Sequence, residues 1–81
     1  MEITLLYFAQ LADLAGKTEE TRHLTEESTD PATLYQALCE EYNFPLRFEQ
    51  VQVAVNHKLA RQATTLRNGD TIAFLPPMAG G

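Results

Sequence analysis

The chain ends in Pro76-Pro77-Met78-Ala79-Gly80-Gly81, an ending with the features of a segment that projects into another protein. The two prolines fix φ and stiffen the chain as it leaves the last expected strand. Ala79 and the two glycines after it have almost no side-chain bulk, so this tail suits a channel in which larger side chains would clash. A frayed end and a cloning remnant are the alternative interpretations, because chain ends often have no structural role.

Activation of the Gly81 carboxylate is the chemistry open to such a terminus. A free carboxylate is anionic and resists nucleophiles at neutral pH, whereas an acyl-adenylate made with ATP has a good leaving group that a sulfur nucleophile can displace. Gly81 lacks a side chain, so both faces of its carbonyl are open to attack. The chain itself then needs no general base. The functional interpretation of the tail therefore predicts a carrier, with the catalytic side chains on partner enzymes.

Other residues with chemical potential are scattered along the sequence. His23 and His57 lack the convergent partners that a catalytic or metal site requires, and Cys39 is interpreted as a packing residue or an inert thiol. The sequence contains no phosphate-binding glycine-rich loop and no His-Glu-x-x-His motif. We therefore expect no stably bound cofactor and no metal. The paired glutamates are interpreted as solvated carboxylates: Glu19-Glu20, Glu26-Glu27 and Glu40-Glu41.

Length and charge narrow the classes of function. A chain of 81 residues forms one domain with little interior to spare for an enclosed active site. The net charge of −5, without a Lys/Arg cluster, argues against nucleic acid or an anionic membrane as a partner. The single cysteine excludes a disulfide framework, and no basic leader or long apolar run is present, so we expect a cytoplasmic location.

Hydrophobic periodicity predicts four strands and two helices. The expected strands cover residues 2–8, 21–25 (with Leu24 inward), 51–55 and 71–75. A short helix is expected over residues 9–15, ending at Gly16, and the main helix follows Asp30 as its cap and Pro31 as its first residue. Turns are expected at residues 56–57, before a short segment around Leu59, and at residues 66–70. The apolar stripe of the main helix is expected to consist of Leu34, Ala37, Leu38 and Tyr42.

This order of elements favours a mixed sheet that covers the main helix with one face. The first and last strands are the most apolar, so we expect them side by side at the centre of the sheet. Their second faces would leave an exposed patch of large side chains, which on a small acidic domain usually marks a protein interface. The expected patch consists of Leu6, Phe8, Leu75 and Leu59.

Three stretches carry a family likeness. They are Ile3 to Phe8 followed by Ala9-Gln10; Val53-Ala-Val-Asn56; and Leu66-x-x-Gly69-Asp70-x-Ile72-Ala-Phe-x-Pro76-Pro77-x-x-Gly80-Gly81. With these motifs the chain resembles, over essentially its whole length, the small subunits of molybdopterin synthase, which are ubiquitin-like β-grasp sulfur carriers. Segments 17–30 and 44–50 are less diagnostic.

The resemblance implies an α+β fold of the ubiquitin-like β-grasp type, with four to five strands in a mixed sheet packed on one main helix plus a short helix. Residues 1–75 would form this domain and residues 76–81 an extended tail. An E1-like enzyme would use ATP to adenylate Gly81, and sulfur transfer would then give a thiocarboxylate. Partner docking would use Phe8, Leu59 and Leu75.

The same resemblance implies that the tail enters the active site of the synthase large subunit, where the sulfur would attack a cyclic pyranopterin precursor to build the molybdopterin dithiolene. Small and large subunits would assemble as a heterotetramer. The residues that thread the channel would be Pro76, Pro77, Met78, Ala79 and Gly80.

Three other functions remain open from the sequence. The chain could carry sulfur for thiamin synthesis or tRNA thiolation, although the Pro-Pro pair favours the molybdopterin family. A ubiquitin-like modifier would form isopeptide bonds with lysines of other proteins. A plain interaction domain would make no use of the tail.

Overall fold

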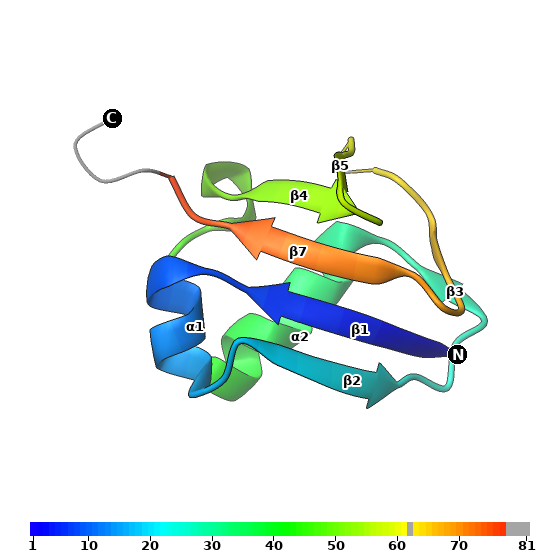
Figure 1. The fold of residues 1–81 in the computed structure, drawn as a ribbon, viewed down its shortest axis with the longest axis horizontal. Coiled ribbons are helices and arrows are strands. Elements are labelled where there is room, and N and C mark those ends of the chain that lie inside the picture. Colours follow the sequence, from blue (N-terminus) through cyan, green and yellow to red (C-terminus); the bar gives the residue numbers. More distant parts are fainter. Residues whose placement is uncertain (62, 78–81) are drawn as a thin grey trace.

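Two parallel strands rich in apolar residues form the centre of the sheet, β1 (Glu2–Tyr7) and β7 (Thr71–Leu75), as seen in the computed structural model (Figure 1). The structure describes residues 1–61 and 63–77. The five-stranded sheet has the order β2-β1-β7-β4-β5, with β2 (Glu19–His23), β4 (Gln52–Val55) and β5 (Lys58–Leu59). The expected mixed sheet, with its first and last strands adjacent, is therefore confirmed.

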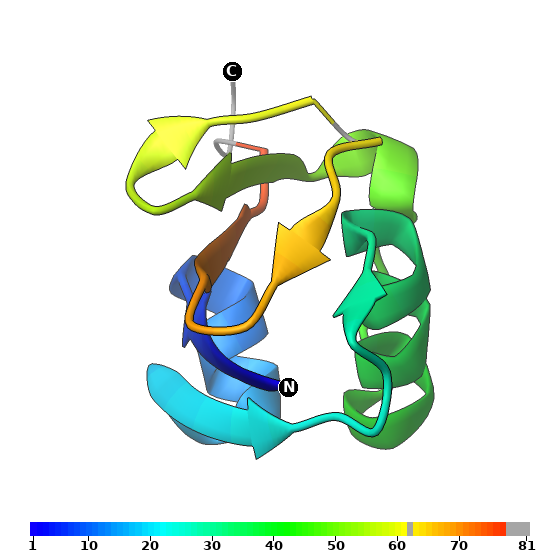
Figure 2. The same ribbon diagram turned by 90° about the vertical axis from the view of Figure 1, so that its right-hand side faces the viewer.

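Three helical segments and a second small sheet complete the fold. They are α1 (Ala9–Ala15), α2 (Pro31–Tyr42), the 3₁₀ helix η1 (Phe48–Gln50), and the antiparallel pair β3 (Ser28–Thr29) and β6 (Leu66–Arg67). Figure 2 shows α2 beside one face of the sheet and leaves the other face without a helix. The interior lies between α2 and the sheet.

Strand alternation places Ile3, Leu5 and Tyr7 of β1 in the core, each at most 2% exposed. Ile72 and Phe74 of β7 are fully buried beside them, as expected from the sequence. The side chains of β1 and β7 that alternate with these must point to the opposite face. This alternation creates the outer face on which the candidate site lies.

Helix α2 begins as the sequence predicts. The Asp30 carboxylate accepts a hydrogen bond from the Thr33 N–H at 2.7 Å, Pro31 occupies the first turn, and Asn43 ends the helix in the left-handed conformation at φ 58°. One prediction about the apolar stripe is wrong, because Ala37 is exposed. Its expected place in the core belongs to Tyr35, whose ring lies 5.1 Å from that of Phe74.

The second strand is also shifted from its predicted range of 21–25 to Glu19–His23. The inward positions of β2 are Glu20 and Arg22, which bond to each other, so the strand shows no apolar alternation in the sequence. The expectation that Leu24 faces inward is confirmed, because Leu24 packs against the core. The β3–β6 pair was missed altogether, since two-residue strands have no readable periodicity.

The turn predicted at residues 56–57 is confirmed, whereas the turn predicted over residues 66–70 is shorter, because Leu66 and Arg67 pair with β3 as strand β6. Asn56 and His57 both have positive φ in the hairpin between β4 and β5, and Gly69 has φ 89°. The Asn56 side chain joins the two turns: its Nδ2 donates to Asp70 Oδ1, and its Oδ1 accepts from the Thr71 N–H, each at 3.0 Å. These two hydrogen bonds connect the end of β4 to the start of β7, at the end of the sheet opposite the C-terminal tail.

Candidate functional site

The outer face of the sheet carries a row of apolar side chains across four strands. Leu6 lies opposite Ala73, Ala73 opposite Ala54, and Ala54 opposite Leu59. Leu6 and Ala54 are half-buried, and Leu59 is 72% exposed. This row is part of what we call the apolar face, defined as Leu6, Phe8, Ala54, Leu59, Ala73 and Leu75.

Phe8 and Leu75 complete the apolar face where both central strands end. Tyr7 lies opposite Phe74, so the parallel register puts Phe8 level with Leu75 on the neighbouring strand. Phe8 keeps an extended backbone (φ −129°, ψ 149°), which turns its side chain away from the buried Tyr7, and it is 43% exposed. The structure therefore brings two of the three predicted docking residues together.

Leu59, the third predicted docking residue, is on the same face but at its far side. It is separated from β1 by β7 and β4, which corresponds to about 14 Å at the usual strand spacing. The small side chains of Ala73 and Ala54 lie between. A partner that contacts both Phe8 and Leu59 must therefore span four strands.

The opposite end of the outer face is polar. His23 Nε2 lies 3.1 Å from Glu2 Oε2, and threonines occupy the neighbouring positions of β1, β2 and β7. At the other end, the apolar side chains are concentrated on the central strands, with Glu19 and Gln52 beside them opposite Leu6 and Leu75. The apolar part is at the end of the sheet from which the C-terminal tail leaves.

The tail leaves the sheet beside the apolar face. Pro76 is half-buried and Pro77 is exposed, and together with residues 49–52 they line a hollow of about 420 Å³. Glu49 and three uncharged residues contribute the other wall. The remaining predicted tail residues (Met78, Ala79, Gly80 and Gly81) lie outside the described residues.

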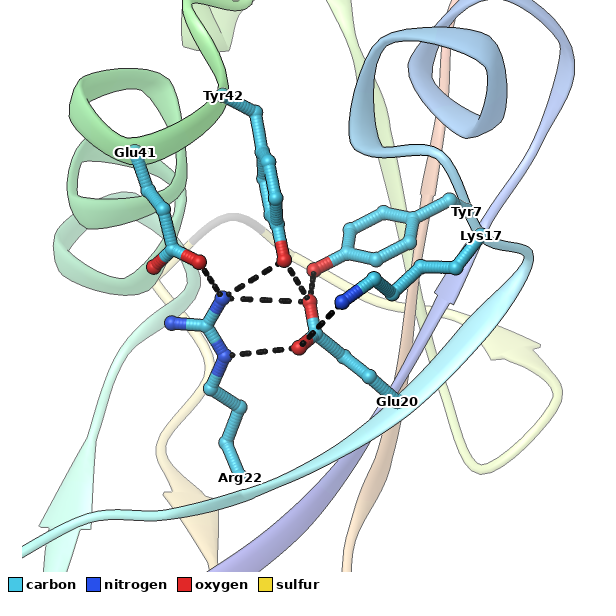
Figure 3. A network of polar contacts seen from close by, with 6 residues as sticks. All are labelled: Tyr7, Lys17, Glu20, Arg22, Glu41 and Tyr42. Carbon is cyan, nitrogen blue, oxygen red and sulfur yellow. Dashed lines mark hydrogen bonds and ion pairs between the residues drawn. The ribbon is translucent and has the colours of Figure 1, made fainter.

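A polar network on the helix side of β2 ties this edge strand to α2 (Figure 3). The Glu20 carboxylate accepts hydrogen bonds from the Tyr7 and Tyr42 hydroxyls, the latter at 2.7 Å, and from the Arg22 guanidinium at 3.2 Å. Arg22 also binds Glu41 of α2 at 2.8 Å. The network lies on the side of the sheet away from the apolar face, so its role is to hold the scaffold.

The pKa values of the network follow from these contacts. Partial burial alone would raise the pKa of Glu20, but the hydrogen bonds from Tyr7, Arg22 and Tyr42 outweigh it and lower the pKa to about 2. Burial, followed by the hydrogen bond to Glu20, raises the pKa of Tyr7 well above its ordinary value. Glu20 is therefore ionised and Tyr7 neutral across the physiological pH range, which suits a fixed structural contact.

The remaining candidate residues stay apart from one another. Burial raises the pKa of the half-buried Cys39 thiol, His57 lies in the β4–β5 turn, and His23 is exposed on β2. Within residues 1–61 and 63–77, no three His, Cys, Asp or Glu side chains are grouped as metal ligands would be. The helices of these same residues are not long and apolar enough to cross a bilayer.

Two features of this end of the molecule escaped the sequence-based reasoning. Ala9, directly after Phe8, has a left-handed backbone with φ 51°, and nothing in the identity of an alanine signals this. Leu14 of α1 is 43% exposed, although its spacing from the buried Leu11 is typical of a core position.

Comparison of the sequence with known proteins identifies the family of the chain. The model of the ThiS family matches residues 5–81. The chain belongs to the ThiS family. Two curated relatives are both named molybdopterin synthase sulfur carrier subunit. The relative from Mycobacterium tuberculosis is 30% identical, and the alignment covers 100% of this chain and 99% of the relative. The relative from Escherichia coli K12 is 32% identical, and the alignment covers 98% of this chain and 99% of the relative.

Solved structures show the same fold for this ThiS-family chain. SAMP1 from Haloferax volcanii matches with a TM-score of 0.79 at 21% identity, covering 100% of both chains. One chain of a Helicobacter pylori complex, that of subunits 1 and 2 of molybdopterin-converting factor, has the same fold. It matches with a TM-score of 0.66 at 23% identity, again over 100% of both chains. The expected α+β, ubiquitin-like β-grasp fold is therefore confirmed.

Proposed function

We propose that this chain is the sulfur carrier subunit of a molybdopterin synthase. The observation that carries the proposal is its membership of the ThiS family together with full-length similarity to curated sulfur carrier subunits of that synthase. The apolar face supports the proposal, because it lies beside the tail exit, where an enzyme that receives the tail would make contact.

The proposed reaction begins with the Gly81 carboxylate. An E1-like enzyme joins this carboxylate to the α-phosphate of ATP and releases pyrophosphate, which gives an acyl-adenylate. A sulfur donor then displaces AMP, and Gly81 becomes a thiocarboxylate. Activation supplies the leaving group that the free carboxylate lacks.

Sulfur transfer takes place in the large subunit. The tail, comprising Pro76, Pro77, Met78, Ala79 and Gly80 before Gly81, threads into its active site. There the thiocarboxylate sulfur attacks a side-chain carbon of the cyclic pyranopterin precursor, and the C–O bond at that carbon breaks as its oxygen substituent leaves. Hydrolysis of the resulting thioester leaves sulfur on the pterin and returns the Gly81 carboxylate. The dithiolene needs two sulfurs, so two charged carriers serve each pterin, in keeping with a heterotetramer of two small and two large subunits.

The test is the intact mass of the protein after incubation with ATP, a sulfur donor and the E1-like enzyme. Exchange of one terminal oxygen for sulfur adds about 16 mass units, as does oxidation of a methionine, so the sample is also treated with a thiol alkylator. We expect a gain that is alkylated and that is lost when Gly81 is deleted.

A second arm of the same experiment identifies the acceptor. The charged protein is mixed with the large subunit and the cyclic pyranopterin precursor, and we expect loss of the added mass together with formation of molybdopterin. A charged protein that keeps its sulfur under these conditions would indicate thiamin synthesis or tRNA thiolation instead. Failure to charge, with an active E1-like enzyme present, would exclude a sulfur carrier.

A further inference from the structure

We propose that two copies of this chain associate through the free edge of β2, as an antiparallel pair of strands with its two-fold axis at Thr21. Figure 1 shows β2 at the margin of the sheet, and no strand of the described part of the chain pairs with its outer edge. Such an edge offers N–H and C=O groups to which a second strand can bind. The inference does not depend on the proposed function, because the apolar face is not part of this edge.

Hydrogen bonds at both ends of β2 show which of its backbone groups point outward. The Tyr7 N–H donates to the Thr18 carbonyl at 2.9 Å, and the Leu24 N–H donates to the Met1 carbonyl at 2.7 Å. In an antiparallel pair, residues whose backbone bonds to the neighbouring strand alternate with residues whose backbone faces away from it. Thr18, Leu24 and the even-numbered residues between them therefore face β1. The residues of β2 whose backbone faces outward are Glu19, Thr21 and His23.

Two-fold pairing about Thr21 uses all of these outward groups. Thr21 exchanges both of its backbone hydrogen bonds with Thr21 of the second copy, and Glu19 does the same with His23 of the second copy. The three side chains are exposed, and those that meet are compatible. Two threonines meet at the axis, and on either side the Glu19 carboxylate faces an imidazole that can donate a hydrogen bond to it.

The charges on the helix side of β2 select this register. With Thr21 at the axis, Glu20 lies opposite Arg22 of the second copy, and Arg22 lies opposite Glu20 of the second copy. Moving the axis to Glu20 would place two carboxylates opposite each other, and moving it to Arg22 would do the same with two guanidinium groups. Like charges in directly opposite positions are destabilising. The strand is therefore complementary to itself about Thr21 but not about the residues on either side.

Pairing at β2 extends the sheet sideways and leaves its outer face uncovered. The contact is small, because each copy contributes a strand of 5 residues with polar side chains, and each copy carries a net charge of −5. Interfaces of this kind are weak and transient, so we expect a dissociation constant of about 0.1–1 mM. The chain is then a monomer at micromolar concentrations and a dimer where it is concentrated.

Nuclear magnetic resonance of the full chain tests the pairing. Amide shifts are followed from about 20 µM to about 2 mM, and sedimentation equilibrium over the same range gives the mass. We expect a monomer–dimer transition in which the largest shifts are those of Glu19, Thr21 and His23. Thr21→Pro removes the outward N–H at the axis, where proline is tolerated on an edge strand, and should weaken the dimer by about tenfold or more. Thr21→Val keeps the N–H and should dimerise within about twofold of the wild type.

An exchange of charges tests the register without a proline. His23→Glu places a carboxylate opposite Glu19 of the second copy, so we expect a weaker dimer. Adding Glu19→Lys restores an opposite-charge pair and should restore dimerisation. The matched control adds Glu40→Lys on α2 instead, which gives the same net charge but leaves the two carboxylates facing each other. This second double variant should remain as weak as His23→Glu.

Three outcomes would overturn the proposal. A chain that stays monomeric to about 2 mM has no association at β2 within the expected range. A dimer that survives Thr21→Pro but is lost in Phe8→Arg uses the apolar face instead. Equal recovery in both double variants would show that net charge, and not the pairing of Glu19 with position 23, controls the association. Circular dichroism checks that each variant is folded.

Discussion

At the scale of single residues, the proposed docking depends on exposed side chains that folding does not require. Phe8 is 43% exposed and Leu59 72% exposed, whereas the residues that alternate with Phe8 along β1 are almost fully buried. Large apolar groups left in water on one face cost solvation free energy that only a partner can recover. The buried face of β1 therefore stabilises the fold, and the proposed function assigns association to the other face.

Arginine at position 8 tests this separation. Phe8→Arg places an unpaired charge in the contact, so we expect the affinity for the large subunit to fall by about tenfold or more, with the fold intact. Leu75→Arg should act in the same way. Titration calorimetry measures the loss, and Thr21→Arg, on the polar end of the same face, is the matched control that should bind normally. Unchanged affinity of both arginine variants would remove the docking assignment.

At the scale of elements, the edge strand β2 is attached through polar contacts. Glu20 bonds to Tyr7 on the neighbouring strand and to Tyr42 at the end of α2, and its side chain is only 14% exposed. Because its pKa in the folded protein is about 2, against 4.5 for the free group, ionised Glu20 stabilises the fold above pH 4.5. That contribution is lost as the pH falls from 4.5 towards 2.

Glu20→Gln should therefore destabilise the protein in a pH-dependent way. At pH 7 we expect its free energy of unfolding to be about 1–3 kcal/mol lower than that of the wild type, with the difference shrinking as the pH approaches 2 to 3. Urea unfolding at several pH values measures this difference. Glu41→Gln is the control: Glu41 is 49% exposed, and its bond to Arg22 should contribute less than about 1 kcal/mol. A difference for Glu20→Gln that does not vary with pH would contradict the role of its charge.

Elements with local signals were predictable from the sequence, and elements made by long-range contacts were not. The cap at Asp30, the positive φ of Gly69 and the alternation in β1 and β7 all follow from residue types in their immediate neighbourhood. The inward face of β2 holds two charged residues, Glu20 and Arg22. Their partial burial depends on hydrogen bonds with the Tyr42 hydroxyl, which α2 places beside them. The left-handed Ala9 likewise results from two anchors, Tyr7 and Leu11, that the tertiary structure fixes.

The same distinction applies to the candidate site. Phe8 and Leu75 could be assigned to one face by alternation, because β-strand geometry is local. Leu59 could not, because β5 has only two residues, and its predicted docking role came from the family resemblance. The separation of Phe8 and Leu59 could not be predicted either, because it depends on the strand order that places β7 and β4 between them. The exposure of Leu14 was unpredictable for a related reason: its environment depends on how α1 sits against the end of the sheet.

At the scale of the whole molecule, stability and the proposed chemistry occupy different parts of the chain. The buried hydrophobic residues of the described structure extend from Ile3 to Phe74, so the core of the described residues lies before Pro76. The group proposed to react, the Gly81 carboxylate, lies beyond the last strand. A carrier can pass between enzymes without unfolding if its reactive end is separate from its core in this way.

Removal of residues 78–81 tests this separation. We expect the truncated protein to unfold within about 2 °C of the full-length midpoint, because the deleted residues follow the core of the described residues, and to accept no sulfur in the intact-mass assay. Leu66→Ala is the opposite control: Leu66 is fully buried, so its truncation should cost about 2–5 kcal/mol while Gly81 remains able to be charged in the folded fraction. A midpoint lowered by the tail deletion as far as by Leu66→Ala would show that the tail stabilises the domain, and that stability and sulfur transfer are coupled.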